Sequence, residues 1–354
     1  MVDYLVVGLG LAGIALCDTL EKHGNTFVVI DDKEHSASAV AGGIYNPVVL
    51  KRLKATWKAG EQLAIAPSFY TALEEKLRIK FHFPGSVYRR FASPEEQNSW
   101  FEAADTLKLA PFLSTKLLPN NNPGIDAPLG YGEVLGSGRI EPLTLLPAYR
   151  DYLKNKGCLH EGRLEHSGLS ISKDQVSYKG LQARKIVFAT GAGLTANPYF
   201  NYLPIRGNKG EYLHIHCPGL REERVIKAAV FLIPNGGDCY TAGATYDYKD
   251  QGKEPTSPAK TYLEEKLGEF VKLPYSITAH VAGIRPTVSD RRPLVGRHPT
   301  ISNMFVLNGF GSRGVMVAPY AAMQLFRLME HGEAPEPETD IARFSRKYFS
   351  GSPL

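Results

Sequence analysis

The chain has 354 residues, of which 43% are hydrophobic and 22% are charged, a composition that excludes a disordered or fibrous protein. Its length exceeds the size at which one hydrophobic core usually stops growing, so we expect two domains. The formal net charge of +5 is modest and is compatible with an acidic ligand. The four cysteines are scattered without a CxxC pair, so neither a disulfide framework nor a metal site is expected.

The first 31 residues carry the pattern of a dinucleotide-binding βαβ unit. The motif GLGLAG at 8–13 lies between an apolar run at 4–7 and a helix-like stretch, and a second apolar run follows at 27–31. Such glycines allow a tight turn, close approach of a pyrophosphate and close packing of the next helix, whose N-terminus supplies unpaired N–H groups. Asp31 ends the second run, where a carboxylate can bind ribose hydroxyls. The predicted nucleotide-binding glycines are Gly8, Gly10 and Gly13. The alternative interpretation is a glycine-rich turn in an unrelated α/β domain.

The following segments alternate between apolar and turn-rich stretches. Residues 35–47 are rich in small side chains and glycine, which is typical of backbone that lies against a ligand. Residues 63–77 have the apolar spacing of a helix, with Ser68 as the predicted cap. Strands are predicted at 80–83 and 86–91, and a loop is predicted at 111–126.

The middle of the chain returns to the first domain and then leaves it again. Residues 138–142 lead into a predicted helix that ends near residue 152. The apolar run 185–189 then ends in a second glycine turn, as expected for another strand of the nucleotide domain. A separate antiparallel sheet is indicated by strand-like runs at 211–216, 230–233 and 239–242.

The final strand, 304–308, runs through a glycine-rich turn at 309–314 into a helix that ends near residue 331. This order predicts an α/β fold in which a Rossmann-like nucleotide-binding domain is interrupted by a discontinuous antiparallel-sheet substrate domain. The nucleotide-binding domain is predicted to comprise 1–79, 138–203 and 284–354, and the substrate domain 80–137 and 204–283.

The N-terminus lacks the basic region of a secretion signal, because it reads Met1-Val2-Asp3 before the apolar run. No segment approaches the roughly 18 consecutive apolar residues that a membrane-spanning helix needs. We therefore expect a cytoplasmic protein without a membrane partner.

Four separated blocks carry a resemblance to one family. They are the opening motif, residues 37–47, residues 188–191, and Gly283-Ile284-Arg285-Pro286 with its downstream Asp290, Pro293 and Gly296. With these blocks in order over almost its whole length, the chain resembles the flavin-dependent D-amino acid oxidase superfamily. The resemblance implies FAD as the cofactor, and the absence of a second GxGxxG motif agrees with this. FAD is expected to be bound non-covalently, because the C-terminal flavin segment has no cysteine.

Two branches of this superfamily are similar to the chain. Glycine oxidases carry a block like 283–286 followed by Gly-Arg-His-Pro, which stands here at 296–299. The flavin domain of the bacterial enzyme that removes a carboxymethyl group from the modified wobble uridine of tRNA carries patterns like 312–315, 318–319 and 243–246. Both resemblances imply hydride transfer from a carbon next to an amine nitrogen to flavin N5, followed by imine hydrolysis.

The resemblance leaves three functions open. The first is FAD-dependent oxidation of the C–N bond of a small amino acid or amine such as glycine, an N-alkylglycine or a D-amino acid. The alternative is removal of the carboxymethyl group from carboxymethylaminomethyl-uridine in tRNA, and the third is a non-enzymatic flavin-binding protein. Besides the opening glycines, the implied FAD contacts are Asp31, Asp32, Ser38, Gly42, Gly43, Thr190, Gly191, Gly309, Gly311, Ser312, Arg313, Gly314 and Val315.

Three residues are predicted to act on the substrate. Arg285 is the predicted carboxylate partner, because a planar guanidinium can bind both oxygens, although a surface arginine is the alternative. Arg313 stands before the last helix as either a second substrate contact or a phosphate clamp, and Tyr246 either donates its hydroxyl or only packs. Relatives often have a tyrosine where this chain has Phe231. The tyrosines that could replace it are Tyr212, Tyr240, Tyr246 and Tyr248.

Two further groups of residues have competing interpretations. His214 and His216 share one face of a strand, but without a third ligand at matching spacing they do not predict a metal site. Basic residues could follow an RNA backbone or form an ordinary solvated surface, and Trp57 is the aromatic residue among them. The basic residues are Lys51, Arg52, Lys54 and Lys58, with Arg291, Arg292 and Arg297 as a second cluster.

Overall fold

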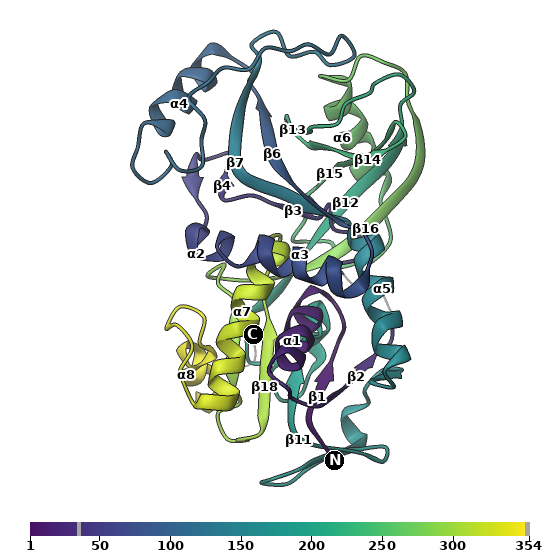
Figure 1. The fold of residues 1–354 in the computed structure, drawn as a ribbon, viewed down its shortest axis with the longest axis vertical. Helices are drawn as coiled ribbons and strands as arrows, with labels where there is room; N and C mark the ends of the chain where they lie inside the picture. The colour runs from purple at the N-terminus through teal and green to yellow at the C-terminus, as the bar shows by residue number, and fades with distance from the viewer. Residues whose placement is uncertain (34–36, 351–354) are drawn as a thin grey trace.

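The first of two large sheets is mainly parallel and occupies the lower half of Figure 1. The computed structural model describes residues 1–33 and 37–350, so residues 35 and 36 of the predicted small-residue segment lie outside it. The strands, in the order β17-β18-β11-β1-β2-β8, are β1 (Val2–Val7), β2 (Phe27–Asp31), β8 (Leu159–Glu161), β11 (Leu181–Phe188), β17 (Leu294–Arg297) and β18 (Met304–Asn308). A hairpin of β9 (Leu169–Ile171) and β10 (Val176–Tyr178) pairs with β11.

The N-terminal apolar run forms an inner strand because both of its faces are covered. β1 pairs in parallel with β2 and β11, and alternate residues of it enter two different hydrophobic cores. A parallel strand buried on both faces requires a continuous apolar run, which residues 4–7 supply.

Four helices build the larger of these two cores. Helix α1 (Leu11–Lys22) packs against α7 (Gly314–His331), and α3 (Ala66–Leu77) and α5 (Pro142–Asn155) extend the same core. Helix α7 ends at His331 because Gly332 adopts a left-handed conformation with a φ of 70°.

The second sheet is mostly antiparallel and curls through the upper half of the molecule (Figure 1). Its strands, in the order β16-β12-β15-β14-β13-β6-β7-β3, are β3 (Ile44–Tyr45), β6 (His82–Arg90), β7 (Tyr131–Ile140), β12 (Ile205–His216), β13 (Val225–Lys227), β14 (Phe231–Gly236), β15 (Cys239–Gly243) and β16 (Ser276–Val288). Helix α6 (Ser257–Gly268) covers one face, where Leu263 and Leu267 pack with Leu213 and Ile215. The other face looks toward the first sheet.

Shorter elements complete the fold, and the chain passes between the two sheets four times. The passes follow β2, β7, β11 and β16. The remaining elements are β4 (Val48–Val49), β5 (Lys54–Ala55), α2 (Ala59–Leu63), α4 (Pro94–Ala104), α8 (Ser345–Ser350) and the 3-10 turns His166–Gly168, Gly191–Ala196 and Ile341–Phe344.

The predicted fold class is confirmed, with corrections to individual elements. The strands predicted at 80–83 and 86–91 are one strand, β6, with an irregularity between Gly85 and Val87. The predicted helix 63–77 begins at Ala66, and Ser68 does not cap it, because Ile65 stands at the cap position without a side-chain hydrogen bond. Ser68 instead lies inside the first turn.

The division of the chain into domain segments remains a proposal. β16 crosses the predicted boundary at 283/284, and β3, from the segment 1–79, pairs with the second sheet. Within 1–33 and 37–350, no helix is both long and apolar enough to cross a lipid bilayer.

Candidate functional site

A cavity of about 980 Å³ lies between the two sheets and reaches from the GLGLAG turn to the inner face of the second sheet. This is within the range of about 300–1,000 Å³ that ligand pockets usually occupy. Gly13 and Gly309 lie behind its wall rather than in it. The predicted site residues that line the cavity are Gly8, Gly10, Asp31, Asp32, Ser38, Gly42, Gly43, Thr190, Gly191, Tyr246, Arg285, Gly311, Ser312, Arg313, Gly314 and Val315.

The glycines of the opening turn are required by close backbone packing. A Cβ on Gly8, whose φ is +99°, would lie 2.6 Å from the carbonyl oxygen of Ala189 on the neighbouring strand. A Cβ on Gly13 would lie 2.1 Å from the carbonyl oxygen of Gly8. These two glycines therefore let the start of α1 sit against the ends of β1 and β11, with its N–H groups at the cavity edge.

Asp31 is held in place at the end of β2. Its Oδ1 accepts a hydrogen bond from the Leu9 amide at 2.9 Å, and its Oδ2 pairs with the Arg150 guanidinium. A carboxylate has further lone pairs, so it can still accept from a ribose hydroxyl. Ser38 Oγ accepts from the Leu11 amide at 3.1 Å, which places this hydroxyl at the N-terminus of α1.

The glycine turn before α7 closes the cavity from the C-terminal side. Gly311 has a φ of +56°, a conformation that glycine adopts without strain. Arg313 donates from Nη2 to the Arg291 carbonyl at 3.0 Å. Burial and the nearby charge of Arg292 lower the pKa of Arg313, but a guanidinium stays charged at neutral pH. Arg313 and the start of α7 therefore bring positive potential to the cavity.

Arg285 projects from β16 and is 9% exposed. Its Nη1 donates to Asn208 Oδ1 at 2.9 Å and to the Thr245 carbonyl at 3.1 Å, and its guanidinium carbon lies 4.5 Å from the centre of the Tyr246 ring. A Cβ on Gly210 would lie 1.9 Å from Nη2, so the guanidinium lies flat over this glycine. No carboxylate in the described part of the chain forms an ion pair with Arg285.

Of the four tyrosines that could replace Phe231, two line the cavity and two do not. Tyr212 and Tyr246 line the cavity, together with Phe231 itself. Tyr240 belongs to the core beneath α6, where its hydroxyl accepts from the Glu222 amide at 2.9 Å, and Tyr248 does not line the cavity. Tyr246 is 63% exposed, and it stacks on Arg285.

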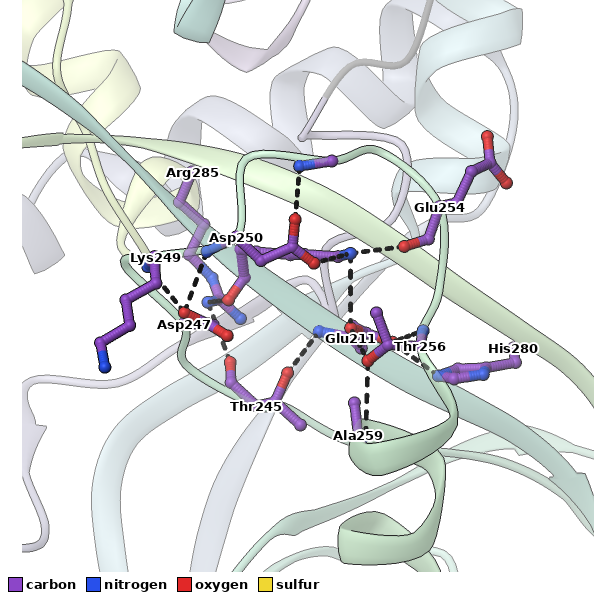
Figure 2. A network of polar contacts seen from close by, with 12 residues as sticks. Glu211, Thr245, Asp247, Lys249, Asp250, Glu254, Thr256, Ala259, His280 and Arg285 are labelled. Atoms are coloured by element: carbon purple, nitrogen blue, oxygen red, sulfur yellow. Dashed lines mark hydrogen bonds and ion pairs between the residues drawn. The ribbon is translucent and has the colours of Figure 1, made fainter.

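A buried polar network ties the loop 244–256 to β12 (Figure 2). Lys209, only 1% exposed, reaches Asp250 Oδ2 at 2.6 Å, and this ion pair lowers the pKa of Asp250. Glu211, 3% exposed, accepts from the Thr256 amide at 2.8 Å and from the Thr256 hydroxyl at 2.9 Å. The loop also carries the Thr245 carbonyl that Arg285 contacts, so the network positions that guanidinium indirectly.

A family model described as FAD dependent oxidoreductase (DAO) matches residues 3–328. The chain belongs to this FAD-dependent oxidoreductase family. The resemblance inferred from the four sequence blocks is thereby confirmed.

Individual relatives of this oxidoreductase have low sequence identity to it. A glycine oxidase of Geobacillus kaustophilus is 22% identical over 380 residues, which cover 97% of this chain and 96% of the relative. The tRNA 5-methylaminomethyl-2-thiouridine biosynthesis bifunctional protein MnmC of Azoarcus sp. is 23% identical over 398 residues, which cover 95% of this chain and 58% of the relative. The chain thus spans about half the length of the MnmC proteins it matches.

Solved structures share the fold of this oxidoreductase at low sequence identity. The glycine oxidase of Geobacillus kaustophilus superposes with a TM-score of 0.76 at 19% identity and 97% coverage of both chains. The iminodiacetate oxidase of Chelativorans sp. BNC1 gives a TM-score of 0.74 at 19% identity, with 96% of this chain and 98% of that chain covered. These matches confirm the α/β fold with one parallel and one curled antiparallel sheet.

The residues at the first sheet fit the FAD that the family uses. The GLGLAG turn and the start of α1 offer N–H groups for a pyrophosphate, and Asp31 offers carboxylate oxygens for a ribose. Gly42 and Gly43, which line the cavity, let this segment pack closely on the second sheet, because Cβ atoms there would lie 2.6 Å from Ile233 Cδ1 and 2.0 Å from the Ile140 carbonyl oxygen.

The sequence analysis missed several residues of the cavity wall. Arg163 and His166 follow β8, which pairs in parallel with β2, and the loops at the carboxyl ends of parallel strands meet at one edge of a sheet. Recognising β8 as a strand would have revealed them. Asn308 donates to the Gly191 carbonyl at 3.0 Å and joins the two glycine turns, and Lys227 enters from β13 in the middle of the second sheet.

The two histidines and the basic residues of the sequence analysis lie in different surroundings. His214 Nδ1 lies 3.0 Å from Thr241 Oγ1, and residues 1–33 and 37–350 contain no group of three side chains suited to a metal. Lys51 lines the cavity, whereas Lys58 pairs with Glu61 and Glu336. Of the second cluster, Arg292 pairs with Glu338.

Proposed function

We propose that this protein oxidises the C–N bond of a small amino acid or N-alkylated amino acid, with the substrate carboxylate bound by Arg285. The observation that carries the proposal is the uncompensated charge of this nearly buried guanidinium in the cavity wall. A buried charge without an acidic partner is costly, and an anionic ligand that enters the cavity removes that cost.

The surroundings of Arg285 give it a fixed direction. Its Nη1 is held by the Asn208 side chain and the Thr245 carbonyl, while Nε and Nη2 make no hydrogen bond to residues 1–33 or 37–350. The Tyr246 ring and Gly210 confine the guanidinium from its two faces. The remaining N–H groups can therefore donate to a carboxylate, which orients the neighbouring carbon.

The other end of the cavity suits the electron-accepting partner of such a reaction. FAD, when bound, supplies a hydride acceptor, and we propose that it is held non-covalently. The start of α7 and Arg313 provide positive potential that stabilises negative charge as it develops nearby. Both groups are positive at neutral pH, because a helix N-terminus does not titrate and the Arg313 guanidinium stays charged.

Anaerobic bleaching of the visible flavin absorbance tests the proposal. Glycine, sarcosine and D-alanine are compared on the wild type, on Arg285→Met and on the control Arg184→Met, whose side chain is 64% exposed. We expect at least one amino acid to bleach the wild type and the control, with Arg285→Met slower by roughly 100-fold or more. Equal rates for Arg285→Met would overturn the role of Arg285.

Oxidation of a carboxymethylaminomethyl group on tRNA is a second proposal. Its support is the match to MnmC proteins over 95% of this chain and the position of Lys51 at the cavity. Bleaching by tRNA that carries the modified uridine, with no bleaching by free amino acids, would replace the first proposal by this one. Lys51→Glu should then slow the reaction with tRNA.

A further inference from the structure

Lys227 is a further cation in the cavity wall, besides Arg285, Arg313 and Lys51, and the proposed function does not use it. It ends β13, where it pairs with Phe231 of β14. Phe231 in turn pairs with Gly243 of β15, and Gly243 pairs with Tyr212 of β12. Directly paired residues point to the same face of a sheet. Tyr212, Phe231 and Lys227 therefore lie in one row on the cavity face, and all three line the cavity.

The ammonium group of Lys227 lacks an acidic partner. Its Nζ donates to the Ala229 carbonyl at 2.7 Å and lies 4.6 Å from the centre of the Phe231 ring, and no ion pair joins it to a carboxylate of residues 1–33 or 37–350. Arg89, on the adjacent β6, is bound to Glu96 and to the Ala228 carbonyl. Burial, with a smaller contribution from the Arg89 charge, lowers the pKa of Lys227 to about 8.

Arg285 lies on the same face, toward the other end of the cavity floor. It pairs with Asn208, which is four residues before Tyr212 on β12, and its guanidinium leans over Gly210 toward the Tyr212 row. The guanidinium over Gly210 lies two residues, roughly 7 Å, along β12 from the Tyr212 row, and β12 and β13 are three strand spacings, roughly 14 Å, apart, so it is roughly 16 Å from the Lys227 backbone on a flat sheet. The Lys227 side chain reaches toward Phe231 and spans part of this distance, so the two charged heads are separated by on the order of 10 Å.

The surface between Arg285 and Lys227 is formed by two rings. Tyr212 and Phe231 line the cavity there, and the Tyr212 ring covers Gly243, where an added Cβ would lie 2.4 Å from it. A chain of a few carbon and nitrogen atoms can lie on such surfaces while its two ends meet the two cations.

We propose that the cavity selects an amino acid with a second anionic group, which Lys227 binds while Arg285 binds the first carboxylate. This inference rests on the proposed function and specifies its substrate class. After a hydrogen bond is allowed at each end, the two anionic groups are separated by roughly four to six bonds. The second group is a carboxylate or a phosphate, since an ammonium binds either one as a point charge.

Binding of ligands that cannot be oxidised tests the pair of cations directly. Glutarate, 4-phosphonobutyrate and the monoanion butyrate are titrated into the flavin-containing protein, and dissociation constants are taken from the change in the flavin spectrum. We expect the better of the two dianions to bind on the order of 10- to 100-fold more tightly than butyrate. The comparison of glutarate with 4-phosphonobutyrate, whose anionic groups are equally far apart along the chain, identifies the second group as carboxylate or phosphate.

Variants assign the preference to one side chain. Lys227→Met should remove the dianion preference, Lys227→Arg should keep most of it, and Lys266→Met on α6 is the control outside the cavity. Equal binding of butyrate and both dianions by the wild type, or an unchanged preference in Lys227→Met, would overturn the inference. If Lys227→Met does not fold, the pH dependence of the wild-type preference decides in its place, because a preference carried by Lys227 should decrease as the pH rises through its pKa of about 8.

Turnover measurements distinguish a failure of this inference from a failure of the proposed function. Sarcosine and its carboxylated analogue, N-carboxymethylglycine, are compared as substrates, and we expect the ratio of their kcat/KM values to fall on the order of 10-fold or more in Lys227→Met. If neither reduces the flavin while glutarate still binds through Lys227, the proposed function fails and the two-cation cavity stands. If both are oxidised equally well by the wild type, the function stands and the selection of a second anion fails.

Discussion

Replacing Gly210 with alanine should separate substrate binding from folding. The added Cβ would lie 1.9 Å from Nη2 and 2.2 Å from Cζ of Arg285. Both atoms belong to the end of a flexible side chain, so we expect the guanidinium to move while β12 keeps its backbone. Water in the cavity can replace the lost hydrogen bonds, so the free energy of unfolding should change by no more than about 1 kcal/mol.

The cost to activity should be much larger. A displaced guanidinium leaves Asn208 Oδ1 and the Thr245 carbonyl, which hold it at 2.9 and 3.1 Å, and so loses its direction toward the substrate carboxylate. A hydrogen bond to a charged group is worth about 1.5–3 kcal/mol, so loss of the carboxylate contact should cost about 3 kcal/mol. This corresponds to a roughly hundredfold lower kcat/KM.

Steady-state kinetics and urea unfolding measure the two effects side by side. Gly85→Ala is the matched control, because it also changes a strand glycine, and its added Cβ meets nothing within 4 Å. Wild-type kcat/KM in Gly210→Ala would refute the placement of Arg285 as the carboxylate partner. A large loss of stability would show that the strand, rather than the side chain, gives way.

Three further predictions concern the network, the cofactor turn and pH. Lys209→Met should lower the free energy of unfolding in urea by about 3 kcal/mol, because Asp250 and the buried Glu211 both lose their lysine while Glu211 keeps the His280 ring at 2.9 Å, and a normal stability would contradict this. Gly13→Ala should purify with little flavin, seen as a low ratio of visible to ultraviolet absorbance, because its Cβ would lie 2.1 Å from the Gly8 carbonyl oxygen. Lys227 is protonated below its pKa of about 8 and neutral above it, so the preference for a dianion should decrease as the pH rises through that value. A preference that stays constant from pH 6 to pH 10 would exclude Lys227 as its source.

The sequence predicted those parts of the molecule that depend on local patterns. The strands β1 and β18 with their glycine turns follow from short apolar runs that end in glycine, and β2 follows from an apolar run that ends at Asp31. Helix α4 was missed although Ser93 marks it, since the Ser93 hydroxyl accepts from the Glu96 amide at 3.3 Å as an N-terminal cap.

The geometry of the site, and the residues that were missed, depend on pairing between distant segments. Arg285 is positioned by Asn208 and Thr245, which lie 77 and 40 residues away in the chain. Lys227 belongs to a strand of three residues, too short to show a periodicity. Its place in the cavity follows from the register of β13 on β14, which no local pattern encodes.

The four passes of the chain between the sheets limit how a substrate can enter. A hinge that opened the cavity by separating the sheets would have to bend four connections together, after β2, β7, β11 and β16. Local release of one rim segment needs far less rearrangement, and the loop 244–256 is held mainly by the Lys209 and Glu211 contacts. Residence time of the product should therefore depend on how often this loop detaches, and weakening its anchors should speed release even where it slows chemistry.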